Sequence, residues 1–481
     1  MVALKQSAYY AIGIVMMKGI SLFMIPYITH TLSIAEYGSL EALILLADIG
    51  TILFSLGLLD AMYRYVGVAK GKERQNLISN CFTLSVITCV IGAAALLFCL
   101  PVILTVLPVK FETYQVVMLL IPTMLDGAIS IPLTLMRMES LAKRFCQLTV
   151  LKAVLQGVLT IVLLEMGFGI DGVLFSAAIS SVVLLIYLLP YQYQSMGGFG
   201  YLSHSKKLLR YSLPTLVGLA SVYMLSGLDK WFMASLVGVE DLAIYAVAAK
   251  FALILGLAIQ PYSLWWFPNR MTILKQVDGK SVCADRAILG VNIGVCIATV
   301  MILTIPGFIS FALPQEYESA GVIAISLIVI HIIKNAGDMM NIGCYSGDST
   351  HSQMWIQCCS AALAAVGYFV LGPIFGLWGI IFILGSAYSL RLILFFIVSQ
   401  SHEKLPYRHT QWVLSVSIAV TAIIGHQYLL VLLPQFSAFM LGLVVSVVAS
   451  LIFVKYSVIP IPPSVLTKFN LTWLTRSKHY P

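Results

Sequence analysis

Long apolar runs separated by short polar stretches extend along almost the whole chain, from Tyr9 to Tyr456. A helix that spans a bilayer needs about 20 predominantly apolar residues. Fourteen runs fit this description, centred near Met17, Thr51, Gly92, Leu125, Gly157, Ser181, Gly218, Leu253, Ala298, Ile330, Leu363, Ala387, Ala422 and Ser446. The pattern predicts an all-α integral membrane protein with about fourteen transmembrane helices.

The longest polar break near the middle of the chain covers residues 195–210, which are glycine-rich at the start and basic at the end. We interpret it as a cytoplasmic linker between two six-helix lobes, 1–194 and 211–400. Lobes of six helices have the same orientation, so a pseudo-two-fold axis along the membrane normal would relate them. Two additional transmembrane helices are expected over 411–458, followed by a cytoplasmic tail, 459–481.

The positive charges lie on alternate loops. Of the 28 lysines and arginines, 21 fall in one set of loops and at the termini, whereas the opposite loops hold only Lys110 and Lys230. Because cytoplasmic loops carry an excess of lysine and arginine, this split predicts that both termini are cytoplasmic. The loop at residues 346–352 should also be cytoplasmic but has neither residue type. Twelve helices are therefore the alternative count.

The composition of the chain argues against several classes of function. Apolar residues make up 60% of the 481 and charged residues 10%, against about 25% charged in soluble domains, so no separate soluble catalytic domain fits. The nine cysteines show no CxxC or Cys/His metal spacing, and we expect no metal and no cofactor. An ATP-driven pump is disfavoured because no GxxxxGK[ST] loop occurs. The net charge of +8 lies beside the membrane, so we expect no nucleic-acid partner.

Short motifs stand near the start of each predicted lobe. They are Ile25–Thr29, Ala35–Gly38, Leu56–Leu58 and Arg64–Tyr65 in the first half, and Leu228–Phe232, Val237–Val239 and Ile244–Ala246 in the second. They resemble bacterial polysaccharide flippases of the O-antigen, Wzx-like type, which belong to the MATE/MOP transporter superfamily. The resemblance covers roughly residues 1–400, and Asp229 with Lys230 matches the family's acid–base pair after the seventh helix.

The resemblance implies a substrate and a mechanism. The substrate would be an oligosaccharide repeat unit on undecaprenyl diphosphate, moved by alternating access from the cytoplasmic to the periplasmic face of the bacterial inner membrane. The products would be O-antigen, capsule or exopolysaccharide. No bond changes, so the chain would not be an enzyme. Other expected partners are the lipid bilayer, H+ or Na+ as coupling ion, and polysaccharide polymerase and chain-length proteins.

Two other classes of function are possible for a chain of this composition. A cation-coupled MATE-type multidrug exporter is the alternative, although five basic residues within the predicted helices suit an anionic substrate better than a cationic drug. A polymerase or glycosyltransferase would favour a long outer loop with clustered arginines or histidines, or a DxD metal motif. The sequence has neither.

Two lysines within the predicted helices are the leading substrate-binding candidates. Lys18 lies about ten residues into the first predicted helix and Lys250 about nine into the eighth, so both fall near the membrane midplane. A diphosphate that crosses an environment of low dielectric needs cations there. The resemblance implies the same role, because the peptidoglycan-precursor flippase uses cationic residues on the first helices of its lobes. Alternatively, each lysine pairs with an interior carboxylate and holds helices together.

Three further basic residues are candidates for substrate binding. Lys152 and Arg391 fall within about two turns of the expected cytoplasmic helix ends, so they could instead extend to the interface. Lys334 stands four residues before Asp338, which is the spacing of an ion pair within one helix. Structural roles are therefore the alternative for all three.

Three acidic residues are candidates for ion coupling: Asp48, Asp126 and Asp338. The first two fall near the middle of predicted helices, where a desolvated carboxylate has a raised proton affinity. Either could bind the proton or sodium ion that drives transport.

Overall fold

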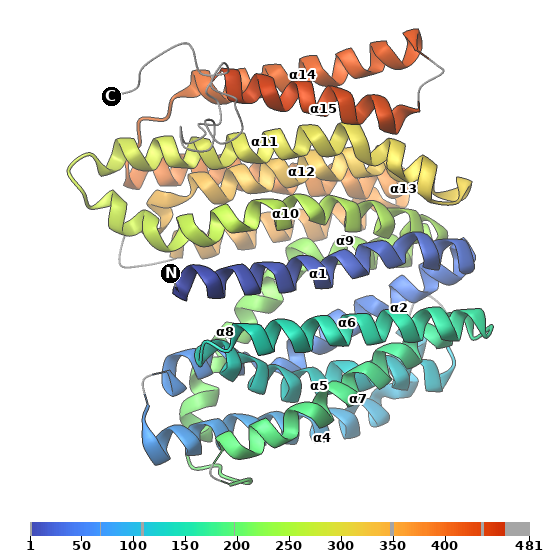
Figure 1. Ribbon diagram of the computed structural model, residues 1–481, viewed down its shortest axis with the longest axis vertical. Coiled ribbons are helices and arrows are strands. Elements are labelled where there is room, and N and C mark those ends of the chain that lie inside the picture. Colours follow the sequence, from blue (N-terminus) through green and yellow to red (C-terminus); the bar gives the residue numbers. More distant parts are fainter. Residues whose placement is uncertain are drawn as a thin grey trace. The chain divides into compact units, whose positions relative to one another are not determined.

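The computed structural model describes residues 2–67, 69–106, 110–196, 198–346, 351–433 and 437–456. All regular elements in these ranges are helices (Figure 1). Contacts divide the chain into two compact units, Met1–Ala243 and Ile244–Pro481. The predicted all-α membrane fold is confirmed, whereas the lobe boundary at residues 195–210 stays a prediction.

The first unit is a bundle of long helices. Its members are α1 (Val2–Thr31), α2 (Ile34–Ser55), α3 (Leu58–Ala61), π-helix η1 (Met62–Val66), α4 (Gly71–Val106), α5 (Thr113–Met138), α6 (Ala142–Glu165), α7 (Gly169–Ser195), α8 (Ser205–Ser226), α9 (Leu228–Phe232) and π-helix η2 (Met233–Val237). Helix α5 packs against α2, α4 and α7, and α6 packs against α1 and α7. Helix α8 packs against α2, α3 and α4.

The start and the break of α2 have local causes. The side chain of Ser33 accepts a hydrogen bond from the Glu36 N–H, and the Ser33 N–H donates one to the Glu36 carboxylate, which is a capping box. Leu56 and Gly57 then both have positive φ, at 47° and 62°. That conformation ends a helix, so the membrane crossing continues as the short segments α3 and η1.

The segment before α8 is fixed on α4. The Gly200 N–H donates to Thr83 Oγ1 at 3.2 Å, and the Asn80 side chain hydrogen-bonds the Ser205 hydroxyl at 3.0 Å. The rings of Phe82 and Phe199 add an edge-to-face contact. The described part of the predicted linker is therefore bound to the first unit through both polar and aromatic contacts.

The second unit is built around α11. Its elements are α10 (Val239–Leu274), which begins in the first unit, α11 (Gly279–Ala312), 3-10 helix η3 (Gln315–Tyr317), α12 (Ala320–Met340), 3-10 helix η4 (Ile342–Tyr345), α13 (His351–His402), α14 (His409–Leu432) and α15 (Ala438–Lys455). Helix α11 contacts α12, α14 and α15, and α12 packs against α13.

Helix α13 is two helices joined at Gly376. A continuous helix of 52 residues would be about 78 Å long at 1.5 Å per residue, more than twice the roughly 30 Å hydrocarbon core. Gly376 has the non-helical angles φ 58° and ψ −138°. Eleven described stretches are long and apolar enough to cross a membrane. With α1 and α8 added and α13 counted twice, they make fourteen crossings, as predicted. The uncertain loop at residues 346–352 lies partly outside the described residues.

Glycines bring α15 close to α11. A Cβ at Gly442 would lie 1.9 Å from the Leu303 carbonyl oxygen, and one at Gly307 would lie 2.5 Å from the Phe439 nitrogen. Small residues allow such close packing between helices in lipid, where no hydrophobic force drives helices together. The two additional helices therefore dock on the second unit through backbone contact.

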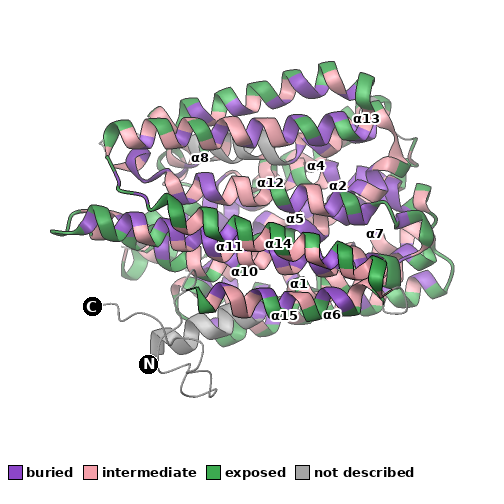
Figure 2. Cartoon of the chain, turned by 90° about the horizontal axis from the view of Figure 1, so that it is seen from above, coloured by how far each residue is buried: buried purple, intermediate pink, exposed green. Residues whose placement is uncertain are grey.

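Apolar side chains cover the outside as well as the inside. Exposed and buried positions alternate along the helices in Figure 2, and many exposed positions are large and apolar, such as Phe98 at 88% and Val431 at 78%. A water-soluble monomer rarely exposes large contiguous apolar patches. Lipid is therefore the natural solvent of this surface, which makes the chain a multi-pass membrane protein.

Candidate functional site

Lys18 and Lys250 lie near the middle of membrane-length helices. Lys18 is central in α1 and its side chain is exposed, and no described carboxylate forms an ion pair with it. Lys250 is half-buried and lies near the centre of the apolar span Val239–Phe267 of α10. The two residues belong to different units, and each is described within its own.

Asp126 and Lys152 are electrostatic neighbours. Asp126 lies on α5 and Lys152 on α6, both only partly exposed, and each charge acts on the other. The Ser130 hydroxyl donates a weak hydrogen bond of 3.4 Å to Asp126 Oδ2. The sequence assigned these two residues to separate roles, in ion coupling and in substrate binding. Their proximity favours the structural alternative, because opposite charges compensate each other at membrane depth.

A second polar group in the first unit surrounds Tyr223 of α8. Its hydroxyl donates a long hydrogen bond of 3.4 Å to the Leu45 carbonyl of α2. The carboxylates of Asp48 on α2 and Asp229 on α9 both act on this hydroxyl. Asp48 is exposed, whereas Asp229 is only 5% exposed. Asp48, a candidate for ion coupling, and Asp229, the acidic residue of the motif Leu228–Phe232, therefore both lie close enough to Tyr223 to act on its hydroxyl.

Arg391 and Asp338 form an ion pair in the second unit. Arg391 Nη2 donates to Asp338 Oδ1 at 2.6 Å, and Arg391 Nε donates to Gln357 Oε1 at 3.0 Å. The guanidinium also lies 4.7 Å from the centroid of the Phe395 ring. The network thus joins α12 to both halves of α13.

The structure bears on two alternatives that the sequence left open. Helix spacing suggested Lys334 as a partner of Asp338, and the structure shows that Asp338 also pairs with Arg391. The Lys334 ammonium lies 5.7 Å from the centroid of the Tyr388 ring. The alternative that Arg391 extends to the membrane interface does not fit, because its side chain is 7% exposed and lies well before the end of α13. The cause is tertiary contact between helices, which the spacing within one helix does not report.

Sequence reasoning missed two buried charges. Glu41 of α2 is only 2% exposed, and its position inside an apolar run was the signal that could have revealed it. Arg270 was counted as a loop charge, but it is 7% exposed on the extended end of α10. It donates to Asn341 Oδ1 at 2.8 Å and stacks on Tyr345, 4.6 Å from the ring centroid. Burial lowers the pKa of this guanidinium.

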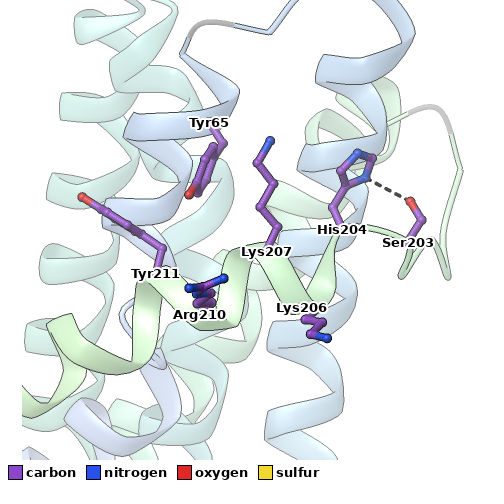
Figure 3. A pocket seen from close by; sticks show the side chains of 7 residues that line it. All are labelled: Tyr65, Ser203, His204, Lys206, Lys207, Arg210 and Tyr211. Atoms are coloured by element: carbon purple, nitrogen blue, oxygen red, sulfur yellow. Dashed lines mark hydrogen bonds between the residues drawn. The ribbon is translucent and has the colours of Figure 1, made fainter.

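A pocket of about 730 Å³ lies in the first unit beside the start of α8. It is lined by Tyr65 of η1, by Ser203 and His204, and by Lys206, Lys207, Arg210 and Tyr211 of α8. Figure 3 shows the Lys207 side chain extending toward the Tyr65 ring, with Arg210 below the two tyrosines. The sequence treated these basic residues only as markers of topology.

Comparison with known proteins gives the family. The family model described as "Polysaccharide biosynthesis protein" matches residues 3–270, more than half of the chain. The chain belongs to this family. No curated protein sequence matches it.

Solved structures of low sequence identity share the fold. A lipid II flippase MurJ in an inward closed conformation matches with a TM-score of 0.72 at 12% identity, over 93% of this chain and 99% of that one. An outward-facing multidrug resistance MATE transporter of the MOP superfamily matches with a TM-score of 0.52 at 17% identity, over 82% and 95%. At these identities the two structures show the fold of this chain. The family model confirms the resemblance to polysaccharide biosynthesis proteins that the sequence motifs indicated.

Proposed function

We propose that the chain is a flippase for undecaprenyl-diphosphate-linked oligosaccharide repeat units. It moves them from the cytoplasmic to the periplasmic face of a bacterial inner membrane by alternating access, for O-antigen, capsule or exopolysaccharide. Both termini are cytoplasmic in this proposal. The membership in a polysaccharide biosynthesis family supports the sugar substrate, and the flippase-like fold is consistent with movement of a lipid-linked molecule.

Lys18 is the observation that carries the proposal. An ammonium at the centre of a membrane-length helix costs about 2.5 to 3.5 kcal/mol on insertion scales, and no described carboxylate pairs with it. A cation kept exposed at this depth suits a passing anion, because the diphosphate would otherwise be desolvated without compensation. Lysine supplies a compact charge with three rotatable donors. Lys250 would serve the same purpose in the second unit.

The other intramembrane charges have supporting roles in this proposal. Asp48, beside Tyr223, is the leading candidate for binding a coupling proton or sodium ion because it is exposed. Asp126 and Asp338 each have a cationic neighbour, so either would couple an ion only by releasing Lys152 or Arg391. Polysaccharide polymerase and chain-length proteins would receive the product on the opposite face.

Gene deletion in the host tests the function directly. We expect lipid-linked repeat units to accumulate on the cytoplasmic side and surface polysaccharide to be lost. Complementation with Lys18→Gln or Lys250→Gln should fail at normal protein levels, whereas Lys18→Arg should restore part of the export because the charge remains. Lys72→Gln, a change at an exposed residue in the first turn of α4, is the matched control and should complement fully. Normal export in both glutamine variants would reject the proposal that Lys18 and Lys250 bind the diphosphate.

The MATE fold keeps drug export as a second candidate. A cationic drug needs an acidic binding site, and a deletion strain would then become sensitive to cationic dyes while its polysaccharide stayed normal. The flippase proposal expects the opposite pair of results.

A further inference from the structure

The pocket beside α8 is lined by several positive side chains. Lys206, Lys207 and Arg210 line it and are exposed, and none of the described lining residues is acidic. No described carboxylate forms an ion pair with any of the three. Like charges this close repel one another. An anion bound in the pocket would attract all three side chains and so offset their mutual repulsion.

Aromatic rings hold one cation of the pocket, Lys207, and the neighbouring Arg64 in place without neutralising them. The Lys207 ammonium lies 4.6 Å from the centroid of the Tyr65 ring, and the Arg64 guanidinium lies 4.8 Å from that of Tyr211. The two rings contact each other edge to face at 5.7 Å. A cation–π contact orders a side chain, but unlike a carboxylate it leaves the positive charge available. The pocket is therefore pre-organised for a negative ligand.

The walls of the pocket are also fixed. Ser203 and His204 are hydrogen-bonded to each other at 3.0 Å, as Figure 3 shows. The Asn80 contact with Ser205 ties the same segment to α4. A wall anchored in this way keeps its donors in position, which reduces the entropy lost on binding.

The pocket lies at the end of an apolar span. It opens where η1 ends one apolar span and where α8 begins. The predicted topology places this side of the helices in the cytoplasm, where the lipid-linked repeat unit would be assembled. A headgroup at the interface can reach the pocket while its hydrocarbon tail stays in the bilayer.

We propose that this pocket is a loading site that receives the diphosphate of the lipid-linked substrate before it reaches Lys18 and Lys250. The proposal rests on the function proposed above. Lys207 and Arg210 bind the phosphate oxygens by charge-assisted hydrogen bonds, and the Tyr65 hydroxyl adds a neutral donor. A diphosphate carries more negative charge than the single phosphodiester of an ordinary phospholipid, so a site with several cations discriminates in its favour.

Binding to the full-length protein in nanodiscs of phosphatidylcholine tests this site. The probe is undecaprenyl diphosphate, and the background is Lys18→Gln with Lys250→Gln, so that the midplane lysines do not contribute. We expect the further change Lys207→Gln with Arg210→Gln to weaken binding by at least about tenfold, since two charge-assisted contacts are lost. Lys72→Gln is the matched control and should leave the affinity unchanged. Lys207→Arg, which keeps the charge, should retain binding and shows that the site still folds.

Three results would overturn the loading site. The first is equal affinity with and without Lys207 and Arg210. The second is competition by phosphatidylglycerol as effective as that of undecaprenyl diphosphate, which would make the pocket a site for ordinary anionic lipid. The third is normal export by the Lys207→Gln, Arg210→Gln protein despite weakened binding. Failure of the proposed function itself would appear elsewhere, as normal surface polysaccharide in the deletion strain.

Discussion

The ion pair between Arg391 and Asp338 gives a prediction that separates structure from transport. Removing one partner of a buried pair typically costs about 3 to 5 kcal/mol because the other charge is left uncompensated. The Arg391 side chain is 7% exposed, but that of Asp338 is 32% exposed, so water can solvate the remaining carboxylate in part. We therefore expect Arg391→Met to lower the free energy of unfolding by about 2 to 3 kcal/mol, including the lost bond to Gln357.

The assay is reversible unfolding of the purified protein in detergent. Asp338→Asn alone should also destabilise, and the double variant should lose less stability than the sum of the two single changes, by about 1 to 2 kcal/mol. The control is Lys280→Met, which removes a surface pair with Glu403 in which the lysine side chain is 58% exposed. That change should cost less than about 1 kcal/mol.

Export measured per folded molecule completes the test. If Arg391 mainly holds α12 against α13, Arg391→Met should lower protein abundance and export in parallel. Normal stability together with lost export would refute this reasoning and would indicate that Arg391 binds the substrate. Additive effects in the double variant would also refute it, because the two side chains would then not act on each other.

Three further predictions concern topology, packing and charge. A cysteine introduced at Ser203, with the native cysteines replaced, should resist impermeant thiol reagents added to intact cells, and labelling there would reverse the proposed orientation. Gly442→Leu should push α15 away from α11 and cost about 1 to 3 kcal/mol of unfolding free energy, whereas Gly425→Leu, with open space around it, should be tolerated; equal effects would contradict the backbone contact. Asp126→Asn should lower protein abundance and a second change, Lys152→Gln, should restore it; no restoration would argue against their pairing.

The number of helices could be predicted because the signal for it is local. Each crossing needs its own apolar run, so the sequence located even the two halves of α13, which the structure joins at Gly376. The breaks within crossings were not predicted. The α2 break at Leu56 and Gly57 depends on left-handed backbone angles, and an apolar run such as Leu56–Leu58 does not reveal them. A leucine with positive φ is unusual and has no sequence signal of its own.

The partners of the charges could not be predicted, because they come from distant parts of the chain. Arg391 and Asp338 are 53 residues apart and belong to different helices, so the search within one helix pointed to Lys334. The central positions of Lys18 and Lys250 along their helices could be predicted, because they follow from the apolar runs. The pocket beside α8 could not be predicted from the sequence, because tertiary packing alone brings Tyr65 of η1 next to Lys207 and Tyr211 of α8.

Two groups among the described charges differ in their energetic consequences for transport. Asp126 with Lys152 and Asp338 with Arg391 are compensated inside the protein, so they need no substrate and can stay in place throughout a cycle. Lys18, Lys207 and Arg210 are exposed and form no ion pair with a described carboxylate. A flippase must bind its anion firmly enough to offset desolvation and weakly enough to release it. Exposed cations meet both needs, because water or an anion can solvate them in turn. A carboxylate placed beside Lys18, for example through Leu22→Asp one turn away, should therefore compete with the diphosphate and reduce export while leaving the helix stable; unchanged export at normal abundance would show that Lys18 lies outside the substrate path.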